Sequence, residues 1–243
     1  MPLLVVTGAS RGIGRAIAER GLERGLAVCA IARDRAALAT LGPADRVEVG
    51  VADVRDAAAV RTAVDAAVAR FGAPTLVVAA AGLLGPIDRP WRLDPAALDE
   101  ALSVTITGTA NLAAATLPAL RGTFVAVSAS SATRVFPGWA AYGAAKAGLD
   151  AYIRYLAAEA GDEVTAFSFV PGLTDTAMQA GLREVDAERF PMVDQFRRWH
   201  DRGVSKAPAA VAEALELALA LPRDEVHGGV VEADALLKAQ AAR

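Results

Sequence analysis

The chain has 243 residues and a formal net charge of −3, and 54% of its residues are hydrophobic while only 5% are aromatic. This length suits one large α/β domain whose single core buries most of the apolar surface, and the lack of a basic block argues against nucleic acid as a partner. The one cysteine, Cys29, excludes a disulfide framework and is typical of a reducing compartment, and no run is apolar enough to span a bilayer.

The first residues lead directly into an apolar run and leave no room for a signal peptide, so we expect a cytoplasmic protein. His200 and His227 lie far apart in the sequence, and neither has neighbours at the spacing of metal ligands. We therefore expect no metal site.

Short apolar runs alternate with helical patterns along the whole chain, which predicts a parallel sheet covered by helices on both faces. The predicted strands are 3–7, 27–32, 46–51, 75–80, 123–128, 164–170 and 229–233. The predicted helices lie near 12–24, 35–41, 56–71, 94–120, 140–160 and 208–221. No linker, repeat or low-complexity block divides the chain, so we expect a single domain over 1–243.

Two segments depart from this alternation. The segment 174–205 is charged and carries Phe190, Phe196 and Trp199, and we expect it to cover the site as a substrate lid. The stretch 109–120 is apolar nearly all round, which indicates a helix that is deeply buried or packed against a partner subunit.

A glycine-rich turn, Thr7-Gly8-Ala9-Ser10-Arg11-Gly12-Ile13-Gly14, follows the first strand and opens into the first helix. Strand, glycine turn and helix in this order are the setting of a dinucleotide site. Gly8 permits the tight turn, Gly12 lets the backbone approach a pyrophosphate, and Gly14 allows close packing of helix on strand. The free N–H groups at the helix start point at the phosphate oxygens. Taken alone, the pattern is also compatible with a tight turn in another α/β protein.

A second pattern, Tyr142-Gly143-Ala144-Ala145-Lys146, lies on the helix that follows the fifth strand. Residues four apart share one helical face, so the phenol and the ammonium project together. A neighbouring cation favours the phenolate and eases proton transfer near neutral pH. An isolated pair of this kind is more often a surface Tyr beside a solvated Lys.

Four motifs in order resemble the classical short-chain dehydrogenase/reductase family. The glycine turn matches TGxxxGxG, Asp53-Val54 matches the adenine-contacting pair after the third strand, Tyr142 and Lys146 match YxxxK, and Pro171-Gly172 with Thr176 matches PGxxxT. The resemblance implies a three-layer, Rossmann-like, doubly wound parallel sheet with strand order 3-2-1-4-5-6-7. It also implies hydride transfer between a nicotinamide and a carbonyl or alcohol carbon.

In that resemblance Tyr142 donates the proton, while Lys146 binds the ribose and lowers the pKa of the Tyr. The residues implied to contact the cofactor are Gly8, Ser10, Arg11, Gly12, Ile13, Gly14, Arg33, Asp53, Val54, Ala80, Gly82, Tyr142, Lys146, Pro171, Gly172, Thr174 and Thr176.

The second strand ends without the acid that would accept a hydrogen bond from a ribose 2′-hydroxyl. Arg33 follows it instead, and Arg11 stands in the glycine turn. Two guanidiniums suit a 2′-phosphate, so we expect NADP(H) in preference to NAD(H). The alternative is that Arg33 only begins the next helix.

Several positions depart from the family pattern. Its usual NNAG reads Ala79-Ala80-Ala81-Gly82, and its helix Asn falls on Thr105. Its catalytic Ser falls on Ala129, which Ser128 and Ser130 flank. Because side chains alternate along a strand, Ser128 points away from the side of Ala129. We expect Ser130 to polarise the carbonyl, with Ser128 second.

These departures leave two functions open. One is an NADPH-dependent carbonyl reductase, and the other is a weakly catalytic NADP(H)-binding member that acts as a sensor or scaffold. The order of residues from Met178 to Ser205 resembles the sepiapterin and benzil reductase branch, which implies a small, fairly apolar ketone or diketone as substrate. Trp139 could wall the pocket, and family members are commonly oligomers, so we expect a homodimer or homotetramer.

Overall fold

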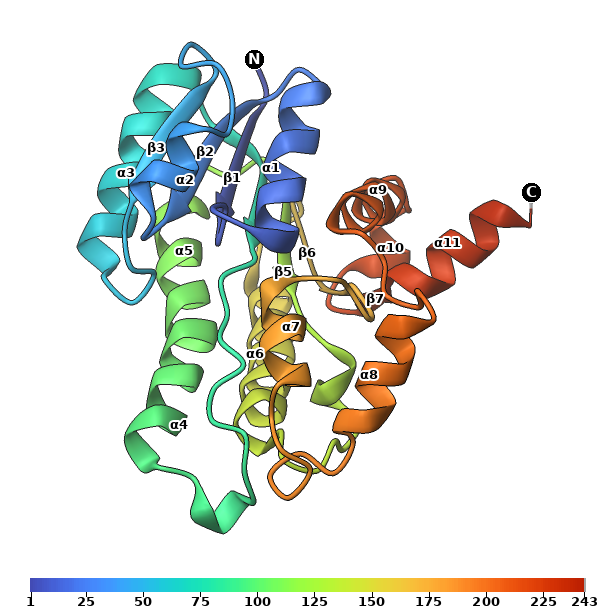
Figure 1. Ribbon diagram of the computed structural model, residues 1–243. Coiled ribbons are helices and arrows are strands. Elements are labelled where there is room, and N and C mark those ends of the chain that lie inside the picture. The colour runs from blue at the N-terminus through green and yellow to red at the C-terminus, as the bar shows by residue number, and fades with distance from the viewer. Residues whose placement is uncertain (243) are drawn as a thin grey trace.

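The computed structural model describes residues 1–242, which form a seven-stranded parallel sheet between two layers of helices (Figure 1). The strand order is β3-β2-β1-β4-β5-β6-β7, which confirms the order implied by the family resemblance. The strands are β1 (Leu3–Thr7), β2 (Ala27–Ala32), β3 (Val47–Val51), β4 (Pro74–Ala79), β5 (Gly122–Val127), β6 (Val164–Val170) and β7 (Val230–Glu232).

The order of the strands fixes where a ligand can bind. The chain runs outward from β1 through β2 to β3, and then returns to the other side of β1 with β4. Crossovers on opposite faces leave a crevice beyond the carboxyl ends of β1 and β4. The glycine turn after Thr7 and the alanine-rich turn after Ala79 both open at this crevice.

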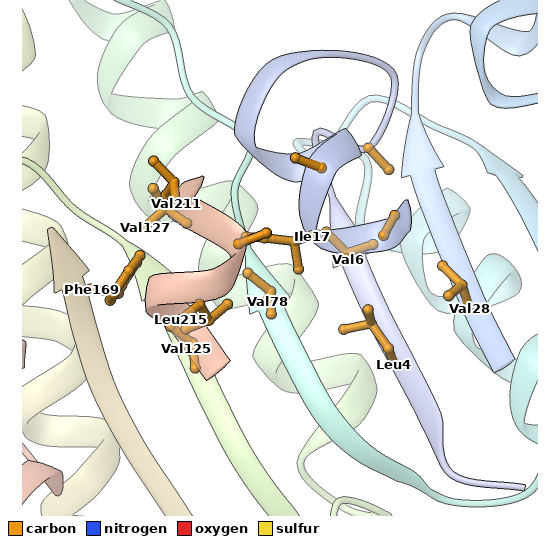
Figure 2. Packing of buried hydrophobic residues seen from close by; sticks show 14 of the residues in the cluster. Leu4, Val6, Ile17, Val28, Val78, Val125, Val127, Phe169, Val211 and Leu215 are labelled. Atoms are coloured by element: carbon orange, nitrogen blue, oxygen red, sulfur yellow. The ribbon is translucent and has the colours of Figure 1, made fainter. Parts of the chain in front are cut away.

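Helices cover both faces of the sheet. The main helices are α1 (Gly12–Glu23), α2 (Arg35–Ala39), α3 (Ala57–Phe71), α4 (Pro95–Leu102), α5 (Gly108–Thr116), α6 (Ala140–Glu159) and α9 (Pro208–Leu219). On one face, α1 and α9 bury Ile17, Val211 and Leu215 against strand residues such as Val78 and Val125 (Figure 2). On the other face, α3, α5 and α6 pack on a second apolar cluster.

The predicted strands are each right to within one residue at either end, because buried parallel strands are continuous apolar runs. The predicted helix over 94–120 is interrupted: α4 and α5 are joined by a π-helical turn, η2 (Ser103–Thr107), and α5 ends at Thr116. Within α5, Leu112 and Ala113 are buried against the chain's own core while Ala114 is exposed. Burial within the subunit therefore accounts for much of that apolar stretch.

Six short elements were not predicted individually, namely the turns η1 (Pro90–Arg92) and η3 (Ser130–Ala132) and the helices α7 (Ala177–Arg183), α8 (Val193–Asp201), α10 (Arg223–Val226) and α11 (Ala233–Ala241). Two of them, α7 and α8, occupy the segment expected to be a lid. They enclose a third apolar cluster built on Trp139, Leu182, Phe190, Val193 and Phe196.

Candidate functional site

The glycine turn needs its glycines for contact reasons that the structure makes explicit. Gly8 has φ +69°, and a Cβ there would lie 2.9 Å from the backbone N of Ala81. A Cβ on Gly14 would lie 2.5 Å from the carbonyl O of Gly8, so helix α1 can approach the turn only with glycine at this position. Helix α1 begins after Arg11 with no side-chain cap, which leaves its first N–H groups available to a ligand.

A cavity of about 720 Å³ lies at the crevice between the carboxyl ends of β1 and β4. Most of the predicted site residues line it: Gly8, Ser10, Arg11, Gly12, Ile13, Gly14, Arg33, Asp53, Val54, Ala80, Gly82, Ser128, Tyr142, Lys146, Pro171 and Thr176. A smaller cavity of about 340 Å³ shares Ser128, Tyr142 and Pro171 with it. The remaining predicted residues, Ser130, Gly172 and Thr174, line only this smaller cavity.

The larger cavity suits a dinucleotide because its glycine turn is open and its backbone donors are free. A Cβ built on Gly12 would meet only the side chain of Thr176, at 3.5 Å, so the backbone here faces the cavity rather than packed protein. The uncapped start of α1 offers N–H groups to a phosphate, as such cofactors require. The donors that line the cavity therefore suit a nicotinamide dinucleotide.

Two residues that hold this cavity in shape escaped the sequence analysis. The Thr7 hydroxyl accepts hydrogen bonds from the backbone N–H groups of Ala80 and Ala81, at 3.2 and 3.3 Å, and so braces the alanine-rich turn. The Asn111 amide on α5 donates to the carbonyls of Val54 and Arg55, at 2.9 and 3.1 Å. Thr7 stands in the glycine-turn motif, which assigned it no role, and Asn111 stands in no motif; each acts on a distant segment.

The charged groups at the nucleotide end are divided between engaged carboxylates and free guanidiniums. Asp34 caps helix α2 by accepting from the backbone N–H of Ala37 at 3.0 Å. Both oxygens of Asp53 are bound by the Arg55 guanidinium, which lowers the pKa of Asp53 to about 2. Arg11 and Arg33 are exposed at the cavity and form no ion pair within residues 1–242.

Tyr142 and Lys146 share one face of α6, as their spacing predicts, and the Lys146 Nζ lies 5.6 Å from the Tyr142 ring centroid. Lys146 is buried, and its Nζ donates to the carbonyl of Val127 at 2.6 Å. Burial lowers the pKa of Lys146 to about 8, and the charge of Asp150 opposes that lowering.

Burial raises the pKa of Tyr142 to about 12. The direction is opposite to the lowering that the family resemblance implies. The physical reason is that desolvation of the buried phenolate dominates, while the Lys146 ammonium is hydrogen-bonded to a backbone carbonyl.

The serines near the end of β5 occupy different positions. Val125 and Val127 pack on the α1 and α9 face, so alternation places Ser128 on the face that α6 covers. Ala129 continues the extended backbone, with φ −155° and ψ 156°. Ser128 is buried, its Oγ has no hydrogen-bond partner in residues 1–242, and it lines both cavities. Ser130 begins the turn η3 and reaches only the smaller cavity.

The smaller cavity has an aromatic wall. Trp139 stacks on Phe190 at a centroid distance of 5.6 Å, and it meets Tyr142 edge to face at the same distance. Phe196 lies 5.4 Å from Trp139 and 5.0 Å from Trp199. Trp139, Phe196 and Trp199 line the cavity together with Tyr142, so an aromatic surface faces the phenol.

The loop after β6, which lines the smaller cavity, is held by an ion pair and by backbone hydrogen bonds. Lys206 forms an ion pair with Asp234, and a Cβ on Gly172 would collide with both side chains, at 2.8 Å from Nζ and 2.6 Å from Oδ2. The N–H of Lys206 donates to the carbonyl of Leu173, and the N–H of Asp175 donates to the carbonyl of Lys206. These bonds join the two ends of the segment that carries α7 and α8.

No helix in residues 1–242 is long and apolar enough to cross a membrane. No group of three or more His, Cys, Asp or Glu side chains in that range is arranged to hold a metal ion. Cys29 is buried, and burial raises the pKa of its thiol to about 12, so it is not a thiolate nucleophile at neutral pH.

Several characterised proteins are similar over most of the chain. Benzil reductase ((S)-benzoin forming) of Bacillus subtilis is 29% identical over 227 residues, covering 88% of this chain and 92% of the relative. Sepiapterin reductase of Meriones unguiculatus is 33% identical over 207 residues, covering 76% of this chain and 78% of the relative.

Solved structures agree in fold. The KRED1-Pglu enzyme superposes with a TM-score of 0.89 at 32% identity, over 95% of this chain and 100% of that one. A short chain dehydrogenase/reductase of Saccharomyces cerevisiae superposes with a TM-score of 0.90 at 29% identity, over 98% and 99% of the two chains. The family model for short chain dehydrogenases matches residues 3–187. The chain therefore belongs to the short-chain dehydrogenase/reductase family and is an oxidoreductase of that family.

Proposed function

We propose that this protein is an NADP(H)-dependent carbonyl reductase that acts on a small, fairly apolar ketone or diketone, or on the corresponding alcohol in reverse. The observation that carries the proposal is the position of Tyr142, which lines both the dinucleotide-shaped cavity and the aromatic cavity. A proton donor at the junction of two such cavities can serve a carbonyl held in one while a cofactor occupies the other.

A nicotinamide held in the larger cavity would supply or accept the hydride. Tyr142 gives its phenolic proton to the carbonyl oxygen as that oxygen gains negative charge. With a pKa of about 12 the phenol is fully protonated near pH 7, which is the form that reduction requires. The Lys146 ammonium, 5.6 Å from the ring centroid, stabilises the phenolate that remains. Because the pKa of Lys146 is about 8, we expect the rate of reduction to fall above about pH 8.

In the family a Ser gives the carbonyl oxygen a second hydrogen-bond donor, but here Ala129 stands at that position. Another side chain must therefore supply the donor. We assign this role to Ser128 ahead of Ser130, which reverses the order expected from sequence. Ser128 is the serine that lines both cavities and has a buried hydroxyl with no hydrogen-bond partner in residues 1–242. Loss of one such donor costs ~10²–10³ in rate in other enzymes.

The preference for NADP(H) rests on the charges at the far end of the larger cavity. Of the two nearby carboxylates, Asp53 is bound on both oxygens by Arg55, and Asp34 accepts a helix-capping hydrogen bond on one oxygen. Arg11 and Arg33 remain exposed at the cavity, and guanidiniums pair well with a 2′-phosphate.

The substrate class rests on the wall of the smaller cavity. Trp139, Phe196 and Trp199 give it an aromatic surface that suits a flat, apolar carbonyl compound. Two similar proteins are named benzil reductase and sepiapterin reductase, which supports a reductase.

One observation favours a second function. The family's polar side chains are replaced by alanine at 79, 80 and 129, which removes hydrogen-bond donors from the reacting end. A member that binds NADP(H) with little turnover, as a sensor or scaffold, would tolerate these replacements. Such a protein does not need the phenol of Tyr142, and the presence of Tyr142 with Lys146 on one face of α6 supports the enzyme.

The test is oxidation of NADPH or NADH, followed at 340 nm with aromatic diketones, in wild type, Tyr142→Phe and Arg33→Ala. We expect turnover with NADPH, its loss in Tyr142→Phe with NADPH binding retained, and a weaker preference for NADPH in Arg33→Ala. Activity that is indifferent to Tyr142 would contradict the assigned proton donor. Tight NADPH binding without turnover on any ketone would favour the sensor.

We also propose a homodimer or homotetramer. Helix α5 keeps Ala110 and Ala114 at least partly open to solvent, and Tyr155 on α6 is 71% exposed, so both long helices offer a surface for a second copy. Sedimentation velocity at micromolar concentration tests this, and a monomer there would contradict it.

A further inference from the structure

Lys146 and Asp150 are the only charged side chains that are buried within residues 1–242. Lys146 is 4% exposed and Asp150 is 7% exposed, and they stand four residues apart on α6. Positions four apart lie one above the other on the same helical face. Burial of a single charge is costly unless an opposite charge compensates it, so the two burials are coupled.

The elements packed around this pair offer no other buried charge. Strands β5 and β6 and the turns η2 and η3 contain no ionisable side chain. Helix α4 carries Asp99 and Glu100, but both are exposed, and Glu100 lies 3.5 Å from Arg55.

On α6 itself, Tyr142 is neutral at pH 7 and Tyr152 is a second phenol whose pKa burial raises. Arg154 is exposed and forms no ion pair in the described part of the chain. Asp150 is therefore the carboxylate that can compensate Lys146.

Asp150 also lacks the structural uses that other aspartates have here. Asp34, Asp56 and Asp94 each cap a helix through their side chains. Asp150 lies in the middle of α6, and its Oδ1 is buried with no hydrogen-bond partner in residues 1–242. A buried carboxylate without such a use needs an explanation.

The Lys146 ammonium does not lean back onto Asp150. Its Nζ donates to the carbonyl of Val127 at 2.6 Å, near Gly82, and it makes no direct ion pair with the carboxylate. The Asp150 carboxylate, one helical turn further along α6, thus stabilises the ammonium through space. In this arrangement the remaining N–H donors of Lys146 stay available to the cavity.

We infer that Asp150 is the internal counter-ion of Lys146, a positioning residue that keeps this ammonium charged and directed at the cofactor cavity. The inference rests on the proposed function only for its consequence in catalysis. Since burial lowers the pKa of Lys146 to about 8 and Asp150 opposes this, removal of the carboxylate lowers the pKa of Lys146 further and reduces the charged fraction at working pH.

The chain contains three lysines, Lys146, Lys206 and Lys238, so lysines labelled with ¹³C at Cε give a spectrum in which each can be titrated. We would compare wild type, Asp150→Asn and Asp150→Glu, with Asp99→Asn as the control for an exposed aspartate near α6. We expect the Lys146 signal to titrate about one pH unit or more lower in Asp150→Asn, to be restored toward wild type in Asp150→Glu, and to be unchanged in Asp99→Asn. An unchanged Lys146 titration in Asp150→Asn would overturn the inference.

Kinetics separates this inference from the proposed function. We expect the alkaline limb of kcat/KM for diketone reduction to move to lower pH in Asp150→Asn, with a loss of ~5-fold or more at pH 8. Reduction by the variant with an unchanged alkaline limb would overturn the inference and leave the function standing. A shifted Lys146 titration in a protein that reduces no ketone would leave the counter-ion standing and count against the function.

If Asp150→Asn does not fold, stability gives the same answer. Lys146→Met leaves Asp150 as a lone buried charge, whereas Lys146→Met with Asp150→Leu removes both charges. We expect the double variant to be more stable than the single variant in urea denaturation. A double variant that is no more stable would overturn the inference.

Discussion

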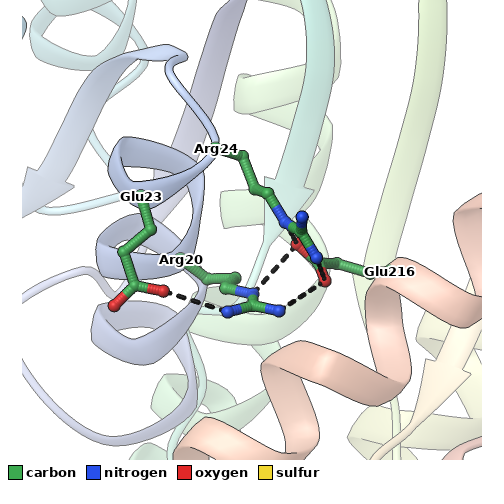
Figure 3. A network of polar contacts seen from close by, with 4 residues as sticks. All are labelled: Arg20, Glu23, Arg24 and Glu216. Atoms are coloured by element: carbon green, nitrogen blue, oxygen red, sulfur yellow. Dashed lines mark hydrogen bonds and ion pairs between the residues drawn. The ribbon is translucent and has the colours of Figure 1, made fainter.

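The carboxylate of Glu216 on α9 joins that helix to α1, and its replacement tests how much the pair of helices depends on it. Its two oxygens accept from both guanidiniums of α1: Arg20 at 3.0 and 2.9 Å, and Arg24 at 2.7 and 2.8 Å (Figure 3). Glu23 holds Arg20 from the other side at 3.1 Å. Glu216→Gln keeps the size of the side chain and removes its charge.

The hydrogen bonds from Arg24 and Arg20 lower the pKa of Glu216 from 4.5 to about 2. At ~1.4 kcal/mol per pKa unit the ceiling is ~3 kcal/mol. The Glu216 side chain is 28% exposed, so solvent screening reduces the expected loss to ~1–2 kcal/mol. Because the folded pKa is depressed, this stability is fully present above about pH 4.5 and is lost as the pH falls toward 2.

The assay is urea denaturation at pH 7 and at pH 3, with Glu213→Gln as the matched control. Glu213 lies on the same helix, is exposed and forms no ion pair within residues 1–242. We expect Glu216→Gln to be less stable than the control at pH 7 and to approach it at pH 3. A loss that is equal at both pH values, or no loss against the control, would refute the electrostatic account.

Three further predictions concern the site. Gly14→Ala places a Cβ 2.5 Å from the carbonyl O of Gly8, so we expect NADPH binding to weaken ~10-fold or more in a fluorescence titration. Gly161→Ala is the control, because a Cβ there meets no atom within 4 Å and should leave binding unaffected. Ala129→Ser adds a donor to the wall of the smaller cavity, so we expect kcat for diketone reduction to rise ~10-fold, and a fall would contradict that position for the carbonyl. Trp139→Leu removes stacking with Phe190, so we expect KM to rise ~5–10-fold for an aromatic diketone and little for an aliphatic one. Equal effects on the two substrates would argue against an aromatic subsite.

The sheet and its order could be predicted because each strand is a continuous apolar run and the glycine turn identifies the first crossover. Elements that depend on distant contacts could not be placed in the same way. The π-helical turn at 103–107 has no Pro or Gly to signal it, and it is fixed where Gly108 packs on Val54, with a Cβ there coming to 2.6 Å. In α8, Val193 and Phe196 are buried three residues apart, a spacing that indicates a helix. The charged residues around them made this apolar pattern too weak to predict the helix from sequence.

The same division holds for the site. That the glycines, Tyr142 and Lys146 line one cavity was predictable, because their positions follow from local spacing. The bracing roles of Thr7 and Asn111 were not, because each acts through hydrogen bonds to a segment more than fifty residues away. The assignment of Ser128 over Ser130 likewise needed the burial and the cavity walls, since the sequence gives both serines the same chemistry.

The side-chain polar atoms that are buried without a hydrogen-bond partner in residues 1–242 belong to Thr105, Ser128, Ser131, Trp139, Asp150 and Ser168. Asp150 lies on α6 and Trp139 lies just before its start. Thr105 and Ser131 lie in the turns η2 and η3, which pack on α6, and Ser128 lines both cavities. Each such atom costs ~1–3 kcal/mol.

Buried polar groups without a partner are expected at a functional site, because they are placed there to bind a ligand or a reacting group. Replacement of Thr105, Ser128 or Ser131 by an apolar residue of similar size should therefore stabilise the protein while it impairs reduction. Ser168, which lies in the sheet away from both cavities, supplies the internal contrast: there the same replacement should leave reduction intact.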